Sequence, residues 1–123
     1  MSVPKILSID DSRMIHTLIK RAFSSYKVEM VFASNGQEGL TVAAREMPDI
    51  ILLDVTMPVM DGYGLLKSIQ TNPQLSHLPV IALTSFAQEE SQEKAKSAGF
   101  YGYALKTNKE TILQAISNFI END

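Results

Sequence analysis

The sequence has no cysteine, no excess of basic residues and no long apolar run. Without cysteine, disulfide scaffolds, thiolate metal sites and thiol nucleophiles are excluded. The 11 basic and 14 acidic residues give a net charge of −3, which argues against a general nucleic-acid binder. The longest aliphatic runs, Ile50–Leu53 and Val80–Leu83, are too short to cross a bilayer. The first residues lack the apolar segment of a secretory signal.

The length and composition are those of one globular domain. The chain has 123 residues, of which 45% are hydrophobic and 20% charged, so it can bury a core. We therefore expect a single domain over residues 1–123, in a cytoplasmic protein without membrane insertion. The last expected helix runs almost to Asp123, and we expect no attached output domain.

Five short apolar runs recur along the chain and predict five β-strands. Most are continuous, as expected for parallel strands buried on both faces. The second run contains Glu29, which favours an edge strand. The expected strands are Lys5–Ile9, Val28–Ala33, Asp49–Leu53, Pro79–Leu83 and Gly102–Leu105.

The stretches between these runs have the apolar period of amphipathic helices. In residues 12–23, for example, the apolar positions are Met14, Ile15, Leu18, Ile19, Ala22 and Phe23. Three capping-box spacings predict helix starts: Ser34 with Gln37, Ser85 with Gln88, and Thr107 with Glu110. Five strands alternating with five helices predict an α/β fold, a three-layer sandwich around a parallel sheet.

The expected helix over Ala87–Ala98 differs from the others. Its apolar residues are three alanines, at positions 87, 95 and 98. It can bury little area, so we expect weak docking, which is typical of elements that move. A well-solvated surface helix and a switching helix both remain open interpretations.

Five polar residues stand at the carboxyl ends of four predicted strands, where parallel sheets bind ligands. Asp10 and Asp11 follow the first strand, Asp54 the third, Thr84 the fourth and Lys106 the fifth. One such aspartate alone is more often a helix N-cap, but the set of five favours a site. The two histidines, His16 and His77, are interpreted as surface residues.

The chemistry of this set favours phosphoryl transfer. Three clustered carboxylates repel one another unless a cation lies among them. Oxygen ligands without His or Cys favour Mg²⁺. A carboxylate can also act as the nucleophile and form an aspartyl-phosphate, and a lysine and a threonine can bind the phosphoryl oxygens.

A longer motif surrounds Asp54. Residues 48–62 read PDIILLDVTMPVMDG, and Ile9-Asp10-Asp11-Ser12, Ala82-Leu83-Thr84-Ser85 and Ala98-Gly99 with Lys106 complete the series. On these motifs the chain resembles the receiver domains of two-component response regulators, and it is similar in size to the single-domain, CheY-like members. The resemblance covers almost the whole chain. It implies the flavodoxin-like strand order 2-1-3-4-5.

The resemblance assigns the metal and phosphoacceptor roles. Asp54 would accept a phosphoryl group from a phosphohistidine. Mg²⁺ would be bound by Asp11, Asp54 and the backbone carbonyl of Thr56, with Asp10 acting through a water molecule.

The same resemblance assigns the switch. Lys106 would pair with the phosphoryl group, and the Thr84 hydroxyl would bond to it. Tyr103 would turn inward and remodel the surface of the fourth helix, fifth strand and fifth helix. Thr56 and Phe86 would tune the phosphoryl lifetime.

The expected function is a stand-alone signalling switch, not an enzyme, with chemotaxis as one candidate pathway. Its expected partners are a sensor histidine kinase or phosphotransfer protein and a downstream target protein, with no nucleic acid, and it is expected to be a monomer. The alternatives are a phosphate sink, a relay intermediate and a phosphorylation-independent interaction module. A haloacid-dehalogenase-type phosphatase is disfavoured because Asp54-Val55-Thr56 lacks a second acid.

Two positions depart from the family pattern. Thr107 replaces the usual proline after Lys106, and because a non-proline cis bond costs about 3 kcal/mol we expect a trans peptide there. Phe100 stands where a small residue is common. It is expected either to crowd the fourth helix or to mark a partner-binding spot.

Overall fold

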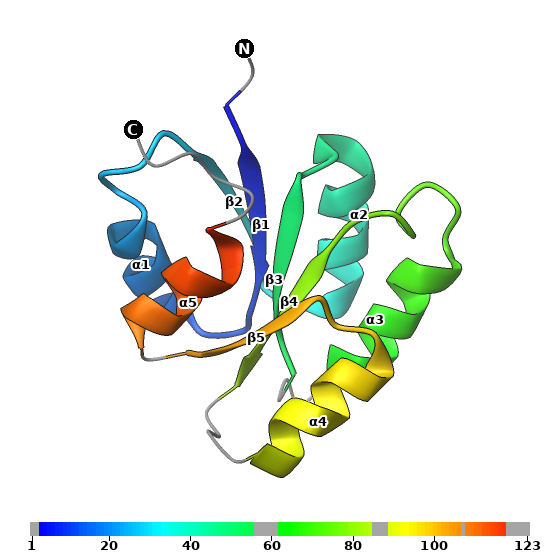
Figure 1. Cartoon of the computed structure of the whole chain (residues 1–123). Coiled ribbons are helices and arrows are strands. Elements are labelled where there is room, and N and C mark those ends of the chain that lie inside the picture. Colours follow the sequence, from blue (N-terminus) through cyan, green and yellow to red (C-terminus); the bar gives the residue numbers. More distant parts are fainter. Residues whose placement is uncertain (1–2, 56–61, 85–88, 107, 118–123) are drawn as a thin grey trace.

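The computed structural model describes residues 3–55, 62–84, 89–106 and 108–117, which form a three-layer α/β/α sandwich (Figure 1). The five strands are parallel and lie in the order 2-1-3-4-5, as predicted. Their carboxyl ends point to the lower edge in Figure 1. The elements are β1 (Lys5–Ile9), α1 (Arg13–Ala22), β2 (Glu29–Ala33), α2 (Gly36–Glu46), β3 (Ile50–Asp54), α3 (Gly62–Thr71), β4 (Val80–Thr84), α4 (Glu89–Ala98), β5 (Gly102–Leu105) and α5 (Lys109–Ile116). Among the described helices, none has the length and apolarity needed to cross a membrane.

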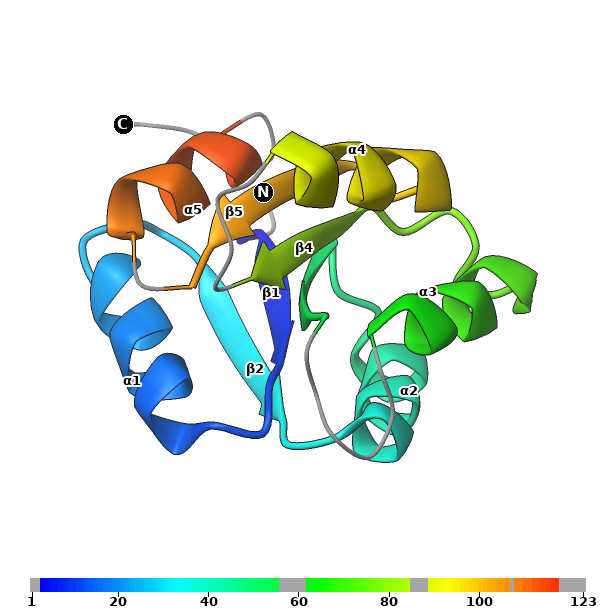
Figure 2. The same ribbon diagram turned by 90° about the horizontal axis from the view of Figure 1, so that it is seen from below.

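The sheet separates two hydrophobic clusters. Successive side chains of a strand point to opposite faces, so Ile6 joins one cluster while Leu7 joins the other. The helices α1 and α5 cover the first face, and α2, α3 and α4 cover the second (Figure 2). Every residue of β3 and β4 is buried, which explains why their runs are continuously apolar. The strand β2 lies at an edge, as Glu29 indicated.

The N-cap of helix α2 lies one residue later than predicted. The side chain of Asn35 accepts a hydrogen bond from the Glu38 N–H at 2.8 Å, and the Glu38 carboxylate accepts one from the Ser34 N–H at 3.0 Å. The predicted Ser34–Gln37 pairing is therefore wrong by one position, because the asparagine beside Ser34 is at least as good an N-cap. The predicted box over 85–88 lies outside the described residues.

Helix α5 shows the same one-residue offset. The cap is Asn108, whose side chain accepts from the Thr111 N–H at 3.2 Å, and not Thr107 with Glu110. The Thr111 hydroxyl in turn accepts a hydrogen bond from the Leu105 N–H at 3.0 Å. This contact ties the start of α5 to the end of β5. The peptide between Lys106 and Thr107 lies outside the described residues.

Helix α1 exposes two residues that the apolar period had assigned to its core face. Met14 is 71% exposed and Leu18 is 41% exposed, while Ile15, Ile19 and Ala22 are buried. The apolar stripe is wider than the arc that one helix can bury against a flat sheet. Met14 and Leu18 lie on the flank of that arc.

His16 is half-buried, so its interpretation as a surface residue is wrong. Its ring lies 4.8 Å from the ring of Phe32 on β2, and among the described residues its Nε2 has no hydrogen-bond partner. Burial lowers the pKa of His16, and this effect outweighs the negative charges of Glu38 and Asp11, which raise the pKa. His77 is exposed, as predicted.

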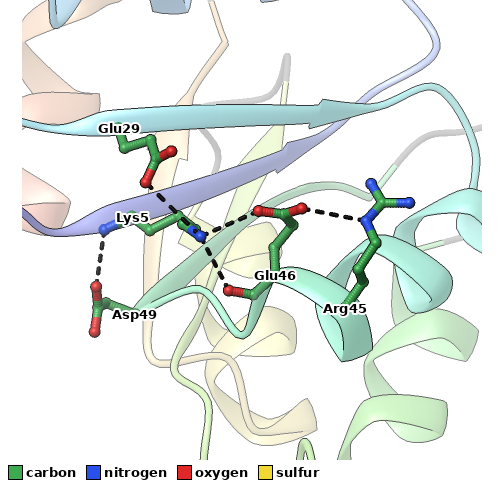
Figure 3. Close-up of polar contacts among 5 residues, drawn as sticks. All are labelled: Lys5, Glu29, Arg45, Glu46 and Asp49. Atoms are coloured by element: carbon green, nitrogen blue, oxygen red, sulfur yellow. Dashed lines mark hydrogen bonds and ion pairs between the residues drawn. The ribbon is translucent and has the colours of Figure 1, made fainter.

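The amino edge of the sheet carries a polar cluster around Lys5, shown in Figure 3. The Lys5 N–H donates to Asp49 at 2.8 Å. Its ammonium donates to the side chain and the carbonyl of Glu46, at 3.1 and 3.3 Å, and lies 3.7 Å from Glu29. Arg45 pairs with Glu46 at 3.2 Å. The cluster joins the start of β1 to β2, to the end of α2 and to the turn before β3.

Candidate functional site

The carboxyl edge of the sheet brings four predicted site residues together. Asp54 and Thr84 are the last residues of β3 and β4, while Asp10 and Lys106 directly follow β1 and β5. These strands are neighbours in the order β1-β3-β4-β5, so the parallel register places their ends side by side. Asp10, Asp54 and Thr84 are almost completely buried, at 0%, 1% and 2% exposure.

Three carboxylates meet at this edge. Asp10, Asp11 and Asp54 each offer an oxygen within 4.8 Å of the other two. Asp10 Oδ1 accepts a hydrogen bond from the Ser12 N–H at 2.9 Å. Within the described part of the chain its Oδ2 is buried without a hydrogen bond. A buried oxygen of this kind, beside two further carboxylates, fits a hard cation such as Mg²⁺.

Lys106 is the positive counterpart of the acids. Its Nζ donates to Asp54 Oδ2 at 2.8 Å and lies 3.4 Å from Asp10 Oδ2. The longer contact is an ion pair without hydrogen-bond geometry. The Lys106 backbone N–H donates to the Thr84 carbonyl at 2.9 Å, which fixes the lysine against the end of β4.

The electrostatics of the pair follow from burial and charge. Burial raises the pKa of Asp10 to about 6, and the negative charge of Asp54 raises it further. The hydrogen bond from the Ser12 N–H and the positive charge of Lys106 act in the opposite direction and lower it. Burial alone would lower the pKa of Lys106, but its hydrogen bond to Asp54 and the charge of Asp10 together raise it. Among the described residues of the site, three acids face one ammonium, so the full set is two charges negative when ionised (3 − 1 = 2).

Gly62, the last residue of the motif that surrounds Asp54, also belongs to the site. A Cβ atom at this position would lie 2.5 Å from the Val55 Cα and 2.8 Å from the Asp54 carbonyl oxygen. Because both neighbours are backbone atoms, a larger residue here would have to displace the start of α3. The start of α3 therefore rests directly on the backbone of the predicted phosphoacceptor.

The predicted switch residues are arranged around β5. Tyr103 is half-buried and packs against the cluster on the α3 face of the sheet. It lines a groove of about 400 Å³ between α4 and α5, with Gln92, Leu105 and Thr111. Two other predicted residues, Thr56 and Phe86, lie outside the described residues.

Comparisons with known proteins agree with this geometry. A family model described as the response regulator receiver domain matches residues 6–117. The polar-differentiation response regulator DivK of Brucella anthropi is 30% identical over 105 residues, which cover 85% of each chain. The structure is similar to the chemotaxis response regulator CheY4 of Vibrio cholerae, with a TM-score of 0.86, 29% identity and coverage of 97% of this chain and 100% of that one.

Some curated relatives are longer than this chain. The probable transcriptional regulator ycf27 of Guillardia theta is 32% identical over 111 residues, which cover 90% of this chain but 42% of that protein.

Proposed function

The chain belongs to the response regulator receiver domain family, and on that premise we propose that it is a signalling switch in which Asp54 accepts a phosphoryl group. The observation that carries the proposal is the buried pair of Asp54 and Lys106, 2.8 Å apart, beside Asp10 and Asp11. A buried carboxylate held by one ammonium is both a nucleophile and the centre of a charge-stabilised site.

The acids of this site would hold Mg²⁺. Asp11 and Asp54 would bind it directly, together with the Thr56 carbonyl, and Asp10 would act through water. The buried Asp10 Oδ2, which lacks a hydrogen bond among the described residues, supports this assignment. When bound, the ion supplies positive charge that lets an anionic phosphodonor approach three carboxylates.

The chain's own residues complete the transfer. An Asp54 carboxylate oxygen attacks the phosphorus of a phosphohistidine, the P–O bond forms as the P–N bond breaks, and the imidazole leaves with the electron pair. Lys106 pairs with the phosphoryl oxygens, and the Thr84 hydroxyl donates to one of them. Positioning and charge neutralisation are the main requirements of this reaction.

The signal would then reach the surface formed by α4, β5 and α5. The contacts of Thr84 and Lys106 with the phosphoryl group exist only after transfer, so they shift a two-state population. Tyr103 would turn inward in the same transition and change the groove between α4 and α5. This makes the protein a switch that is read by a target protein, and it is not a conventional enzyme.

The partners follow from this chemistry. The donor would be a sensor histidine kinase or a phosphotransfer protein, and we propose a cytoplasmic monomer that does not bind nucleic acid. CheY4 is a chemotaxis response regulator and DivK is a polar-differentiation response regulator, so the two proteins belong to different processes. We therefore propose the chemistry of the switch and no particular pathway.

Intact-protein mass spectrometry after incubation with acetyl phosphate tests the proposal. The wild type should gain one labile phosphoryl group in the presence of Mg²⁺ and none with EDTA. Asp54→Asn should gain none. The matched control is Asp49→Asn, an exposed aspartate at the opposite edge of the sheet, which should behave like the wild type. No gain in the wild type with Mg²⁺ would contradict the proposal.

A further inference from the structure

Helix α4 buries very little of its own surface. Among its described side chains only Ala95 is fully buried, and Ala98 is partly buried against the α3-face cluster. One polar contact comes from α3, where the Gln70 side-chain amide donates to the Ala98 carbonyl at 3.2 Å. This small buried area agrees with the alanine-only apolar composition of the helix, while its weak docking stays a prediction. The position of α4 then depends on the few contacts that other residues provide.

The carboxyl end of α4 is fixed by a Schellman motif. Gly99 has a φ of 107° and donates to the Lys96 carbonyl at 3.1 Å, and Phe100 donates to the Ala95 carbonyl at 3.1 Å. The Phe100 side chain is only 5% exposed and belongs to the same cluster as Ala95. Phe100 is therefore a buried anchor beneath the end of α4, and its ring is not presented to a partner.

Tyr63 on α3 contacts both Phe100 and α4. Its ring lies 5.5 Å from the Phe100 ring at an interplanar angle of 83°, an edge-to-face arrangement. The Lys94 ammonium of α4 lies 4.8 Å from the centre of the same Tyr63 ring, a cation–π distance. Tyr63 thus links α3 to the middle of α4 and to the residue that anchors its end.

The residue before Tyr63 is Gly62, which lies against the backbone of Asp54 and Val55. Gly62 leaves no room for even a methyl group at this contact. A shift of the Asp54 backbone toward Gly62 would therefore displace the start of α3, and Tyr63 is the next residue along the chain. The path from Asp54 to α4 uses neither Thr84 nor Tyr103.

We infer that Tyr63 is a positioning residue that couples Asp54 to α4 through Gly62, with Lys94 and Phe100 as its two contacts. The inference rests on the proposed function and adds a second route by which phosphorylation acts on α4. In the structure the Lys106 ammonium donates directly to the Asp54 carboxylate at 2.8 Å, a contact that pairing of Lys106 with a phosphoryl group would replace. The contacts of Tyr63 therefore stabilise α4 in the conformation that phosphorylation has to displace.

Amide hydrogen exchange over residues 89–98 in metal-free protein tests whether the contact between Tyr63 and Lys94 stabilises α4. Lys94→Met removes the charge over the Tyr63 ring, and exchange should accelerate by about 2- to 5-fold, the value of an exposed cation–π contact. Lys94→Arg keeps a cation and should restore the wild-type rate. Lys96→Met, on the same helix, is the matched control and should have no effect. Exchange in strand β3 should be unchanged in all variants.

Affinity for beryllofluoride, a phosphoryl analogue, tests the coupling. Because coupling free energies are reciprocal, variants with a looser α4 should bind it more tightly in Mg²⁺. Lys94→Met should bind about 2- to 5-fold more tightly, and Tyr63→Leu, which loses the ring, at least as tightly as Lys94→Met. Lys94→Arg and Lys96→Met should match the wild type.

The outcomes separate the two proposals. A wild type that binds no beryllofluoride would overturn the proposed function, and the coupling with it. A wild type that binds, with Lys94→Met and Tyr63→Leu unchanged in affinity, would overturn the coupling alone. Equal acceleration of exchange by Lys94→Met and Lys96→Met would also overturn it, because a general charge effect would then explain the loosening.

Discussion

At the scale of single residues, Asp10 shows how the site is built at the expense of stability. Its carboxyl group is fully buried, and its pKa of about 6 lies above the ordinary value of 3.8. A carboxyl whose folded-state pKa is raised stabilises the fold below pH 3.8, and this contribution is lost as the pH rises through about 6. At neutral pH the ionised Asp10 therefore destabilises the protein when no cation is bound.

We expect Asp10→Asn to raise the free energy of unfolding by about 2 kcal/mol at neutral pH in EDTA. Asparagine keeps the acceptor for the Ser12 N–H and removes the buried charge. Urea unfolding followed by circular dichroism measures the difference, with the exposed Asp11→Asn as control, where a smaller change is expected. Mg²⁺ should stabilise the wild type more than Asp10→Asn. Equal stabilities in EDTA would show that burial of this charge costs nothing.

The stability of the protein and the phosphorylation of Asp54 should also depend on Gly62 alone among the glycines of α3. In Gly62→Ala the added methyl would meet the Val55 Cα at 2.5 Å, and backbone atoms cannot yield as a side chain can. We expect a loss of about 1–3 kcal/mol in stability, as for other overpacked sites, and slower phosphorylation of Asp54. Gly64→Ala, at an exposed position of the same helix, should leave both unchanged or raise stability slightly. A Gly62→Ala protein that matches the wild type would refute the close contact.

At the scale of elements, the helices are attached to the sheet in different ways. The helix α1 buries Ile15, Ile19 and Ala22 against the sheet, so the hydrophobic effect holds it. The helix α4 depends on Tyr63 and Phe100 from outside its own span. Helix α2 has an additional polar attachment at its end, where Glu46 meets Lys5 of β1 (Figure 3).

Lys5→Met should therefore destabilise the amino edge of the sheet at neutral pH. The hydrogen bonds from Lys5 and Arg45 lower the pKa of Glu46, so its contribution is present above its ordinary pKa and is lost as the pH falls through the lower folded-state value. On acidification the free energy of unfolding should therefore fall further in the wild type than in Lys5→Met, because the variant lacks the contact between Lys5 and Glu46. Urea unfolding at neutral and acidic pH measures this, with the exposed Lys20→Met as control. High salt should reduce the difference.

At the scale of the whole molecule, the buried Asp10 and the half-buried His16 give the stability opposite dependences on pH. The pKa of Asp10 is raised by burial, so its protonation favours the fold as the pH falls through about 6. The pKa of His16 is lowered by burial below 6.5, so the unfolded chain takes up the proton first and acid disfavours the fold. In mildly acidic solution the two effects partly cancel.

The substitution His16→Phe should separate the pH dependence that comes from His16 from the one that comes from Asp10. Phenylalanine keeps a ring against Phe32, 4.8 Å away in the wild type, and cannot be protonated. We expect the stability of His16→Phe relative to the wild type to increase steadily as the pH falls below about 6.5. The urea midpoint measured across this range gives the answer. A difference that stays constant with pH would show that His16 has the same pKa in the folded and unfolded chains.

Much of the molecule could be predicted because its signals are local. The continuous apolar runs specified buried parallel strands, and the polar residues that end them specified the carboxyl edge where Asp10, Asp54, Thr84 and Lys106 meet. The helix caps were predicted one residue early, because neighbouring Ser and Asn or Thr and Asn residues give overlapping capping patterns. The exposure of Met14 and Leu18 depends on how wide an arc of α1 the sheet can cover, which periodicity does not give.

The order of the elements, the parallel sheet and the residues of the acidic site follow from the amino-acid sequence alone, because strand ends and helical periods are properties of neighbouring residues. The contacts between residues that are distant in the sequence depend on how the layers pack in three dimensions. Gly62 against the Asp54 backbone, Tyr63 between Phe100 and Lys94, and Lys5 beside Glu46 all join separate segments. Distances of this kind arise only when the layers pack, since a spacing in sequence does not fix a spacing in space.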